Sequence, residues 1–431
     1  HEVIDREILC LLIMFRYIRR FTNRNSNVKI IIFPDMWYIL LLGCFALAAG
    51  HDFKTVFSWK QVDYAFPNEI IRNNYAANGN FIPENNMPLG IQVWQDKVFL
   101  TVPRWKKGVV ANLNYVSKND KSPALIPYPN WEMNDINSAD SIVSIFRVRV
   151  DACDRLWGID TGIEDILGDT KVIQPTRLFV IDLKTDKVLR IYTLKDSDQK
   201  HDSFLADLVI DVNPNACDDA YAYLSDLGGY GMVVYSWARN DSWRISHNFF
   251  YFDPLNSDYN VSGFNFQWTD GVFGLSLSPV QEDGCKTLYF HAMSGITEFS
   301  VSTKVLKNET LAQDYYAFHV VGNKGPKSQG PSSLIDPKTG IDYFTQVNRN
   351  GIACWDTSVE LNPNTFILAA QDNETLVFPN DLSLDTETNK LFVISDNLPQ
   401  FQYAKYDLQK FNFFVTAADV DSLTPLCKKT S

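Results

Sequence analysis

The chain has 431 residues, of which 45% are hydrophobic and 21% charged, a composition typical of a folded protein with a sizeable core. Its formal net charge of −12 at pH 7 argues against a nucleic-acid-binding protein, because an acidic surface repels phosphate. The sequence has no GxSxG elbow, phosphate loop, HExxH helix or dinucleotide fingerprint, so cofactor-dependent redox chemistry is not expected.

Residues 36–50, MWYILLLGCFALAAG, are predicted to be a signal peptide. The apolar stretch is too short for a membrane span and ends in small residues, as cleaved signals do, although no basic residue lies between Met36 and the apolar run. We expect cleavage between Ala48 and His51 and a secreted, extracellular protein without a membrane anchor. Residues 1–35 are then not part of the natural protein. The alternative is a genuine longer N-terminus with four arginines between residues 16 and 24 as its basic flank.

The cysteines beyond residue 50 show no CxxC spacing, so a zinc site is not expected. In a secreted chain, four of these five residues would form two disulfides and leave one thiol over. Four Asn-x-Ser/Thr sequons also fit a secretory route and are candidate glycosylation sites. The cysteines are Cys153, Cys217, Cys285, Cys354 and Cys427, and the sequons begin at Asn240, Asn260, Asn308 and Asn373.

Six apolar segments that end in polar residues recur at intervals of roughly 50–65 residues, a period typical of repeat architectures. A second β-rich run and a polar turn such as DPKTG or DTETNK precede most of them. Such units of short antiparallel strands predict an all-β, six-bladed β-propeller over residues 51–431, in one domain. A pair of β-sandwiches would not explain six comparable units. The segments start at Val98, Leu156, Ala222, Leu288, Tyr343 and Leu391.

We interpret these six segments as the inner strands, whose ends would surround the mouth of a central channel. Polar side chains gather at these ends, and such convergence makes the mouth the default ligand site. The residues at comparable positions are Thr101, Asp160, Thr161, Ser225, Asp226, His291, Gln346, Ser395 and Asp396.

Several long blocks resemble the Yellow / major royal jelly protein family of insects, in the same order along nearly all of residues 52–427. They include NMPLGIQVWQDKVFLTVPRWKKGV from Asn86, VDACDRLWGIDTG from Val150, LVIDVNPNACDDAYAYLSDLGGYGMVVY from Leu208, WTDGVFGLSLSP from Trp268 and FPNDLSLDTETNKLFVISDNLPQF from Phe378. The resemblance implies a secreted six-bladed propeller. It also implies disulfides Cys153–Cys217 and Cys354–Cys427, with Cys285 unpaired.

The resemblance implies a role in melanin formation and cuticle pigmentation, with dopachrome conversion in the central channel as the expected activity. Two alternatives stay open. The channel would instead hold a biogenic amine or another small ligand without turnover, or the protein would be a structural or signalling component of cuticle. For dopachrome conversion and for binding without turnover, the partner is a small catechol, indole or amine. The oligomeric state is not predicted.

Dopachrome conversion requires a base near neutral pKa, and His291, placed in the channel by our strand assignment, is the candidate; a buried structural histidine is the alternative. The carboxylates would pair with a cationic amine or cap strand ends, and the aromatic residues would stack on a ligand ring or pack between blades. A bound calcium ion, held by Asp160, Asp226, Asn380 and Asp396, is a further possibility; otherwise no metal or cofactor is expected. The candidate ligand-binding residues are Asp160, Thr161, Asp226, Tyr230, Asp270, Phe273, Gln346, Phe378, Asn380 and Asp396.

Overall fold

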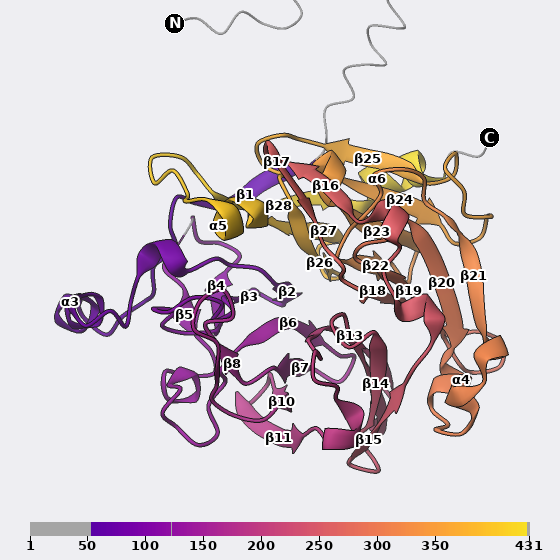
Figure 1. The fold of residues 1–431 in the computed structure, drawn as a ribbon, viewed down its shortest axis with the longest axis horizontal. Coiled ribbons are helices and arrows are strands. Elements are labelled where there is room, and N and C mark those ends of the chain that lie inside the picture. The colour runs from indigo at the N-terminus through magenta and orange to yellow at the C-terminus, as the bar shows by residue number, and fades with distance from the viewer. Residues whose placement is uncertain (1–52, 122, 429–431) are drawn as a thin grey trace, which may run out of the picture. The chain divides into compact units, whose positions relative to one another are not determined.

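The computed structural model describes residues 53–121 and 123–428, and within them six four-stranded antiparallel sheets surround a central axis (Figure 1). The expected six-bladed β-propeller is confirmed. The domain boundaries expected at residues 35 and 50, and the signal peptide between them, lie outside the described residues.

Each blade runs outward from an inner strand that borders the axis. Strands are given from inner to outer. The first blade consists of β2 (Ile91–Trp94), β3 (Lys97–Thr101), β4 (Leu113–Ser117) and β5 (Ile126–Pro127), and the second of β6 (Ile145–Val150), β7 (Arg155–Asp160), β10 (Arg177–Asp182) and β11 (Lys187–Thr193). The third consists of β12 (Leu205–Asn213), β13 (Ala216–Asp226), β14 (Gly231–Ser236) and β15 (Asp241–Ile245), and the fourth of β18 (Val272–Leu277), β19 (Thr287–Ala292), β20 (Thr297–Ser302) and β21 (Phe318–Asn323). The fifth consists of β22 (Ser333–Ile335), β23 (Ile341–Gln346), β24 (Gly351–Asp356) and β25 (Ile367–Gln371), and the sixth of β26 (Pro379–Asp385), β27 (Lys390–Ser395), β28 (Phe413–Asp419) and β1 (Lys54–Trp59).

The ring is closed by strand β1, which comes from the start of the described chain and pairs antiparallel with β28 from its end. This pairing completes the sixth blade with a strand from the other end of the described chain and so joins the last repeat to the first. Two disulfides add covalent links, Cys153–Cys217 between the second and third blades and Cys354–Cys427 between β24 and the C-terminal helix. These are the implied pairs, and Cys285 is free.

Smaller elements decorate the blades. They are the hairpins β8–β9 (Ile163–Glu164, Lys171–Val172) and β16–β17 (Asp258–Val261, Phe264–Gln267), and the helices α3 (Glu69–Ala77), α4 (Thr303–Leu306), α5 (Leu398–Tyr403) and α6 (Val420–Cys427). None of the helices in the described part of the chain has the length and apolar character needed to cross a bilayer.

The core lies between blades, because side chains of a strand alternate between the two faces of its sheet. On β19, Leu288 and Phe290 pack against the third blade. Tyr289 points the other way and contacts Trp355 of the fifth blade, with 5.6 Å between ring centroids. Side chains of a blade's middle strands therefore face neighbouring blades and not the axis.

The inner-strand assignment made from the sequence is wrong by one strand. The six polar-ended segments are β3, β7, β13, β19, β23 and β27, each of which is the second strand of its blade. The inner strands are the six runs that precede them. Both kinds of strand are short and apolar, so their pattern alone does not distinguish the two positions.

Candidate functional site

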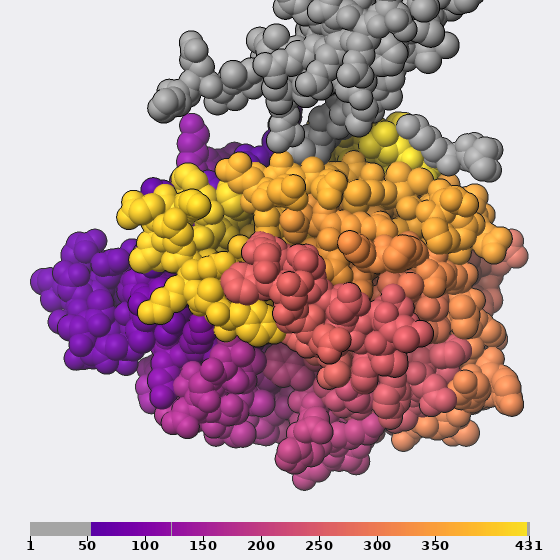
Figure 2. Space-filling model, turned by 45° about the horizontal axis from the view of Figure 1, so that its top comes forward, coloured from indigo at the N-terminus to yellow at the C-terminus, as the bar shows by residue number. Residues whose placement is uncertain are grey.

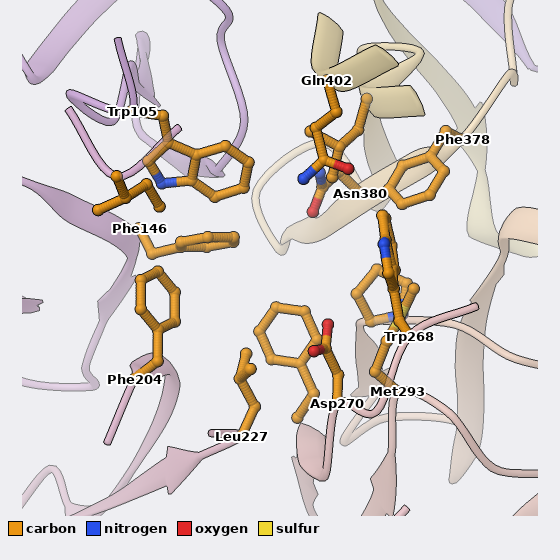
Figure 3. A pocket seen from close by; sticks show the side chains of 14 residues that line it. Trp105, Phe146, Phe204, Leu227, Trp268, Asp270, Met293, Phe378, Asn380 and Gln402 are labelled. Atoms are coloured by element: carbon orange, nitrogen blue, oxygen red, sulfur yellow. The ribbon is translucent and has the colours of Figure 1, made fainter. Parts of the chain in front are cut away.

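A cavity of about 190 Å³ lies at the end of the channel where the inner strands begin; we call it the upper cavity (Figure 3). Its wall is mainly aromatic and aliphatic, with three polar side chains among the lining residues. The residues are Trp105, Phe146, Ile166, Phe204, Leu227, Trp268, Asp270, Phe273, Met293, Pro331, Phe378, Asn380, Leu398 and Gln402. Such an apolar pocket with a few convergent polar groups is the usual form of a small-molecule site.

Phe146, at the start of β6, organises one side of the wall. Its ring lies 5.1 Å from Trp105, 5.6 Å from Phe204 and 5.7 Å from Phe273, centroid to centroid. The contacts with Phe204 and Phe273 are edge-to-face, the arrangement that aromatic rings prefer. Interlocked in this way, the rings form a rigid wall before any ligand enters.

Trp268 and Phe378 form the facing wall, 5.9 Å apart and edge-to-face. Trp268 also donates a hydrogen bond from Nε1 to Oη of Tyr403 at 2.8 Å, and Phe266 packs on both rings. This contact joins hairpin β16–β17 to helix α5, and the two segments lie side by side in the space-filling view (Figure 2). The rim is thus built from two insertions that are far apart in the sequence.

Asp270 supplies the cavity's only carboxylate, and its side chain points into the space between the aromatic walls (Figure 3). Among the described residues, this carboxylate has neither a hydrogen-bond donor nor a cationic partner. Burial raises its pKa to about 6, because a low-dielectric environment disfavours the charged form. Of the fourteen lining residues, Asp270 alone is ionisable near neutral pH.

The backbone around Asp270 is fixed by its neighbours. The carbonyl oxygen of Asp270 accepts from the Ser294 amide at 3.1 Å, and the Gly271 amide donates to the Leu227 carbonyl at 2.9 Å. A Cβ atom at Gly271 would lie 2.5 Å from the Phe250 carbonyl oxygen and from the Tyr230 ring. Only glycine fits at this approach, so Asp270 is held in place without using its side chain.

Behind the cavity wall, the inner strands carry a network of four charges with little exposure: Arg147, Arg149, Asp207 and Asp381. Arg147 Nη1 lies 3.0 Å from Asp207 Oδ2, and Arg149 Nη2 lies 2.9 Å from both Asp207 Oδ1 and Asp381 Oδ1. The two positive and two negative charges cancel. We call this group the four-charge network; it links the inner strands β6, β12 and β26.

Asn380 connects this network to the cavity. Its Oδ1 accepts from Arg147 Nη2 at 3.1 Å, and its Nδ2 donates to Asp396 Oδ2 at 2.8 Å. The Arg147 guanidinium also lies 4.3 Å from the Phe273 ring centroid, within the range of a cation–π contact. Arg147 therefore orients two cavity-lining side chains from below.

Of the ten ligand-binding residues predicted from the sequence, four line the upper cavity: Asp270, Phe273, Phe378 and Asn380. The other six lie elsewhere, and the structure gives each of them a local partner.

Asp160, Asp226 and Asp396 cap strand ends, as the structural alternative stated. Asp160 accepts from the amides of Val143, Ser144 and Gly162 at 2.7–2.9 Å. Asp226 accepts from the amides of Phe204 and Gly229 and from Arg244, and Asp396 accepts from the Leu398 amide. Phe204 and Leu398 line the cavity, so Asp226 and Asp396 fix the backbone of two lining residues without lining the cavity themselves.

The remaining three predicted residues also have structural contacts. Thr161 Oγ1 donates to the Ser144 carbonyl at 3.1 Å, and Gln346 Nε2 to the Thr345 carbonyl at 2.8 Å. Tyr230 lies outside the cavity wall and stacks on Tyr251, with 4.6 Å between ring centroids.

His291, the predicted base, does not line the cavity. It lies on β19 facing the fifth blade, 99% buried, with Nδ1 2.9 Å from Glu298 Oε2 and Nε2 3.1 Å from the Gly330 carbonyl oxygen. Lys324 shares the same Glu298 oxygen at 2.9 Å. Burial lowers the pKa of His291. The predicted channel position is wrong, because side chains of the second strand point between blades.

The four residues nominated for calcium are dispersed. Asn380 and Asp396 contact each other, whereas Asp160 and Asp226 are used by the backbone of two other blades. Across residues 53–121 and 123–428, no three His, Cys, Asp or Glu side chains are grouped so that they could hold a metal ion.

Sequence reasoning missed the residues that come from connections between strands, above all Trp105, Phe204, Trp268 and Gln402. Trp105 follows β3 in VPRW, and Trp268 precedes β18 in WTDG. An aromatic residue just outside a strand, at the end where the inner strands begin, was the available signal.

The fold and cavity define a propeller with a ligand-sized chamber at one end of its channel. The chain matches the family model described as major royal jelly protein over residues 143–426. Protein yellow of Drosophila melanogaster is 39% identical over 382 residues, 87% of this chain and 70% of that protein. Protein yellow of Drosophila yakuba is 38% identical over 402 residues, 91% of this chain and 74% of that protein.

The chain therefore belongs to the Yellow / major royal jelly protein family, and the resemblance noted from its sequence is confirmed. Among solved structures, a gluconolactonase from Xanthomonas campestris aligns over 84% of this chain and 98% of its own, at 11% identity and a TM-score of 0.43. A likeness this low says nothing about activity.

Proposed function

We propose that this is a secreted pigmentation protein whose upper cavity binds a small cationic aromatic amine, such as a catecholamine or indoleamine. The observation that carries the proposal is the unpartnered carboxylate of Asp270 inside an aromatic chamber. A carboxylate that is half-buried in an apolar wall without a partner is costly, and a ligand ammonium supplies the missing partner. Family membership supports the pigmentation role, and the two disulfides support a secretory route.

The walls suit the ring of such a ligand. An apolar cavity of about 150 Å³ accommodates benzene, so about 190 Å³ suits one substituted aromatic system. Trp268 and Phe378 offer faces and edges for stacking. A cation over one of these rings adds about 0.5–2 kcal/mol.

Two amide side chains at the other end of the cavity suit a ligand that donates hydrogen bonds. Gln402 Oε1 is buried and has no partner within the described residues. Asn380 Oδ1 keeps a second lone pair beyond its bond from Arg147. A catechol hydroxyl or an indole N–H supplies donors to such acceptors, and this favours catechols and indoles over purely apolar amines.

Dopachrome conversion is the second candidate, favoured by the pKa of Asp270 near 6, a value that suits a general base. Asp270 would remove the proton from the carbon next to the substrate carboxylate, and a proton would return on the quinone side. Among the described residues, no cationic side chain lines the cavity to receive that substrate carboxylate, so we rank amine binding first. The third alternative, a structural cuticle protein, would leave the cavity without a ligand.

The secretory part of the proposal concerns the four sequons as well. Asn240, Asn260, Asn308 and Asn373 are all exposed, so each is accessible to glycosylation. Mass spectrometry of protein secreted from insect cells, before and after glycosidase treatment, tests their occupancy.

Calorimetric titration tests the amine proposal. Dopamine should bind at 1:1 stoichiometry and at least tenfold more tightly than 4-methylcatechol, which has the ring but no charge. Equal affinity for the two ligands, or no saturable binding of either, would contradict it. Dopachrome decay faster than with heat-inactivated protein, and lost in Asp270→Asn, would instead establish the second candidate.

A further inference from the structure

The channel has a second recess at its opposite end, beyond the four-charge network. It measures about 840 Å³ and lies where the inner strands end; we call it the lower mouth. Arg149 of the four-charge network lines this recess, whereas Asn380, bonded to Arg147 of the same network, lines the upper cavity. The network therefore separates two distinct chambers.

Five of the six inner strands each contribute a half-buried apolar side chain to the lower mouth. These residues are Val150, Val209, Leu277, Leu334 and Leu384, and Gln92 takes the place on the sixth inner strand. Half-buried apolar side chains converging on one recess form a surface that gains from being covered by an apolar ligand.

The wall of the lower mouth carries two ammonium groups that share one carboxylate. Lys286 Nζ and Lys307 Nζ lie 3.1 and 2.7 Å from the two oxygens of one carboxylate, Asp211. Burial alone would raise the pKa of Asp211, but the two lysines hold it below its ordinary value. Asp211 stays ionised and neutralises only one ammonium. Asp219 is the second carboxylate of the lining; it is exposed and forms no ion pair with either lysine in the described residues.

This pair of lysines on one carboxylate is a local feature, since the whole chain carries a net charge of −12. The four-charge network beneath it sums to zero and does not offset it. A further polar group in the wall is unpaired: Ser333 is 97% buried, and its Oγ has no hydrogen-bond partner among the residues that the structure describes.

We propose that the lower mouth binds an amphipathic anion, a long-chain carboxylate whose alkyl chain covers the apolar ring and whose head group pairs with Lys307. The apolar ring sets the preference for a chain, and the two lysines that share one carboxylate set the preference for an anion. This site is independent of amine binding in the upper cavity.

The test is a titration with 11-(dansylamino)undecanoic acid, followed by displacement with laurate and with dodecanol, which has the same chain without the charge. We expect saturable 1:1 binding, with laurate displacing the probe at least tenfold more effectively than dodecanol. Lys307→Gln should weaken laurate binding at least fivefold while Lys286 still pairs with Asp211. Lys304→Gln, an exposed lysine three residues earlier, should change nothing.

Asp270→Asn, in the other chamber, should leave laurate binding unchanged, and dopamine should not displace the probe. Equal displacement by dodecanol, an unchanged affinity in Lys307→Gln, or competition by dopamine would overturn the proposal. Leu334→Glu places a carboxylate in the ring and should abolish binding. If that variant does not fold, the laurate affinity of Lys307→Gln decides whether the proposal stands.

Discussion

The two ends of the channel differ in wall, charge and size, although the same six inner strands build both. The upper cavity is small and aromatic and holds one carboxylate without a partner among the described residues, whereas the lower mouth is larger and aliphatic and has two lysines that share one carboxylate. The difference arises because connecting loops supply much of the upper wall, whereas the ends of the inner strands and their turns supply the lower one. On our proposals, the two chambers of one propeller prefer ligands of opposite charge.

The largest expected effect is a loss of stability when the four-charge network between the two chambers is disrupted. Arg147→Met leaves Asp207 and Asp381 buried with one arginine fewer, and loss of one partner from a buried ion pair costs about 3–5 kcal/mol. Urea unfolding should show this loss. Arg72→Met is the matched control, because its pair with Asp63 is half exposed and should cost about 0–1 kcal/mol. Equal losses in the two variants would show that the network is not required for stability.

Asp270→Asn tests the lone carboxylate. Its folded-state pKa of about 6 lies above the unfolded value of about 4, so the ionised group destabilises the fold by about 3 kcal/mol at neutral pH. The variant should therefore be more stable than wild type above pH 6. This gain should shrink as pH falls and vanish below about pH 4, where both states are protonated. Dopamine binding should weaken at least tenfold.

Asp226→Asn provides the contrast, because that carboxylate accepts two backbone amides and an arginine. Losing these charge-assisted bonds should lower stability at neutral pH. If both variants shift the unfolding midpoint in the same direction, the distinction between a ligand carboxylate and a capping carboxylate is wrong.

The next largest expected effect is a change of dopamine affinity with pH. Aliphatic amines remain protonated between pH 5 and 8, so only Asp270 changes charge in the upper cavity. The association constant for dopamine should be nearly constant above pH 7 and fall toward tenfold per unit as Asp270 is protonated. Titrations at four pH values would measure this, and a flat profile would exclude Asp270 as the ammonium partner.

The smallest effect is expected from the aromatic wall. Trp268→Leu removes a stacking face and its bond to Tyr403 and should weaken dopamine binding by about 0.5–2 kcal/mol, between twofold and thirtyfold. Phe264→Leu, on the same hairpin but outside the cavity lining, serves as the control. An unchanged affinity in Trp268→Leu would place the ligand ring elsewhere.

The sequence was sufficient to predict six blades, because alternating apolar strands and Asp- and Gly-rich turns repeat at a regular interval. It was not sufficient to place the inner strands, because the first two strands of a blade have the same apolar pattern. Asp160 and Asp270 also look alike in sequence, since each lies next to a threonine and shortly before a glycine. Only packing shows that three amides surround the Asp160 carboxylate, whereas no amide in the described part of the chain donates to the Asp270 carboxylate.

The most direct test of the central claim is a crystal structure of the protein with dopamine bound. We predict the ammonium within 4 Å of the Asp270 carboxylate, with the catechol ring between the aromatic walls of the upper cavity. An empty upper cavity at saturating dopamine, or dopamine bound with its ammonium away from Asp270, would contradict the account.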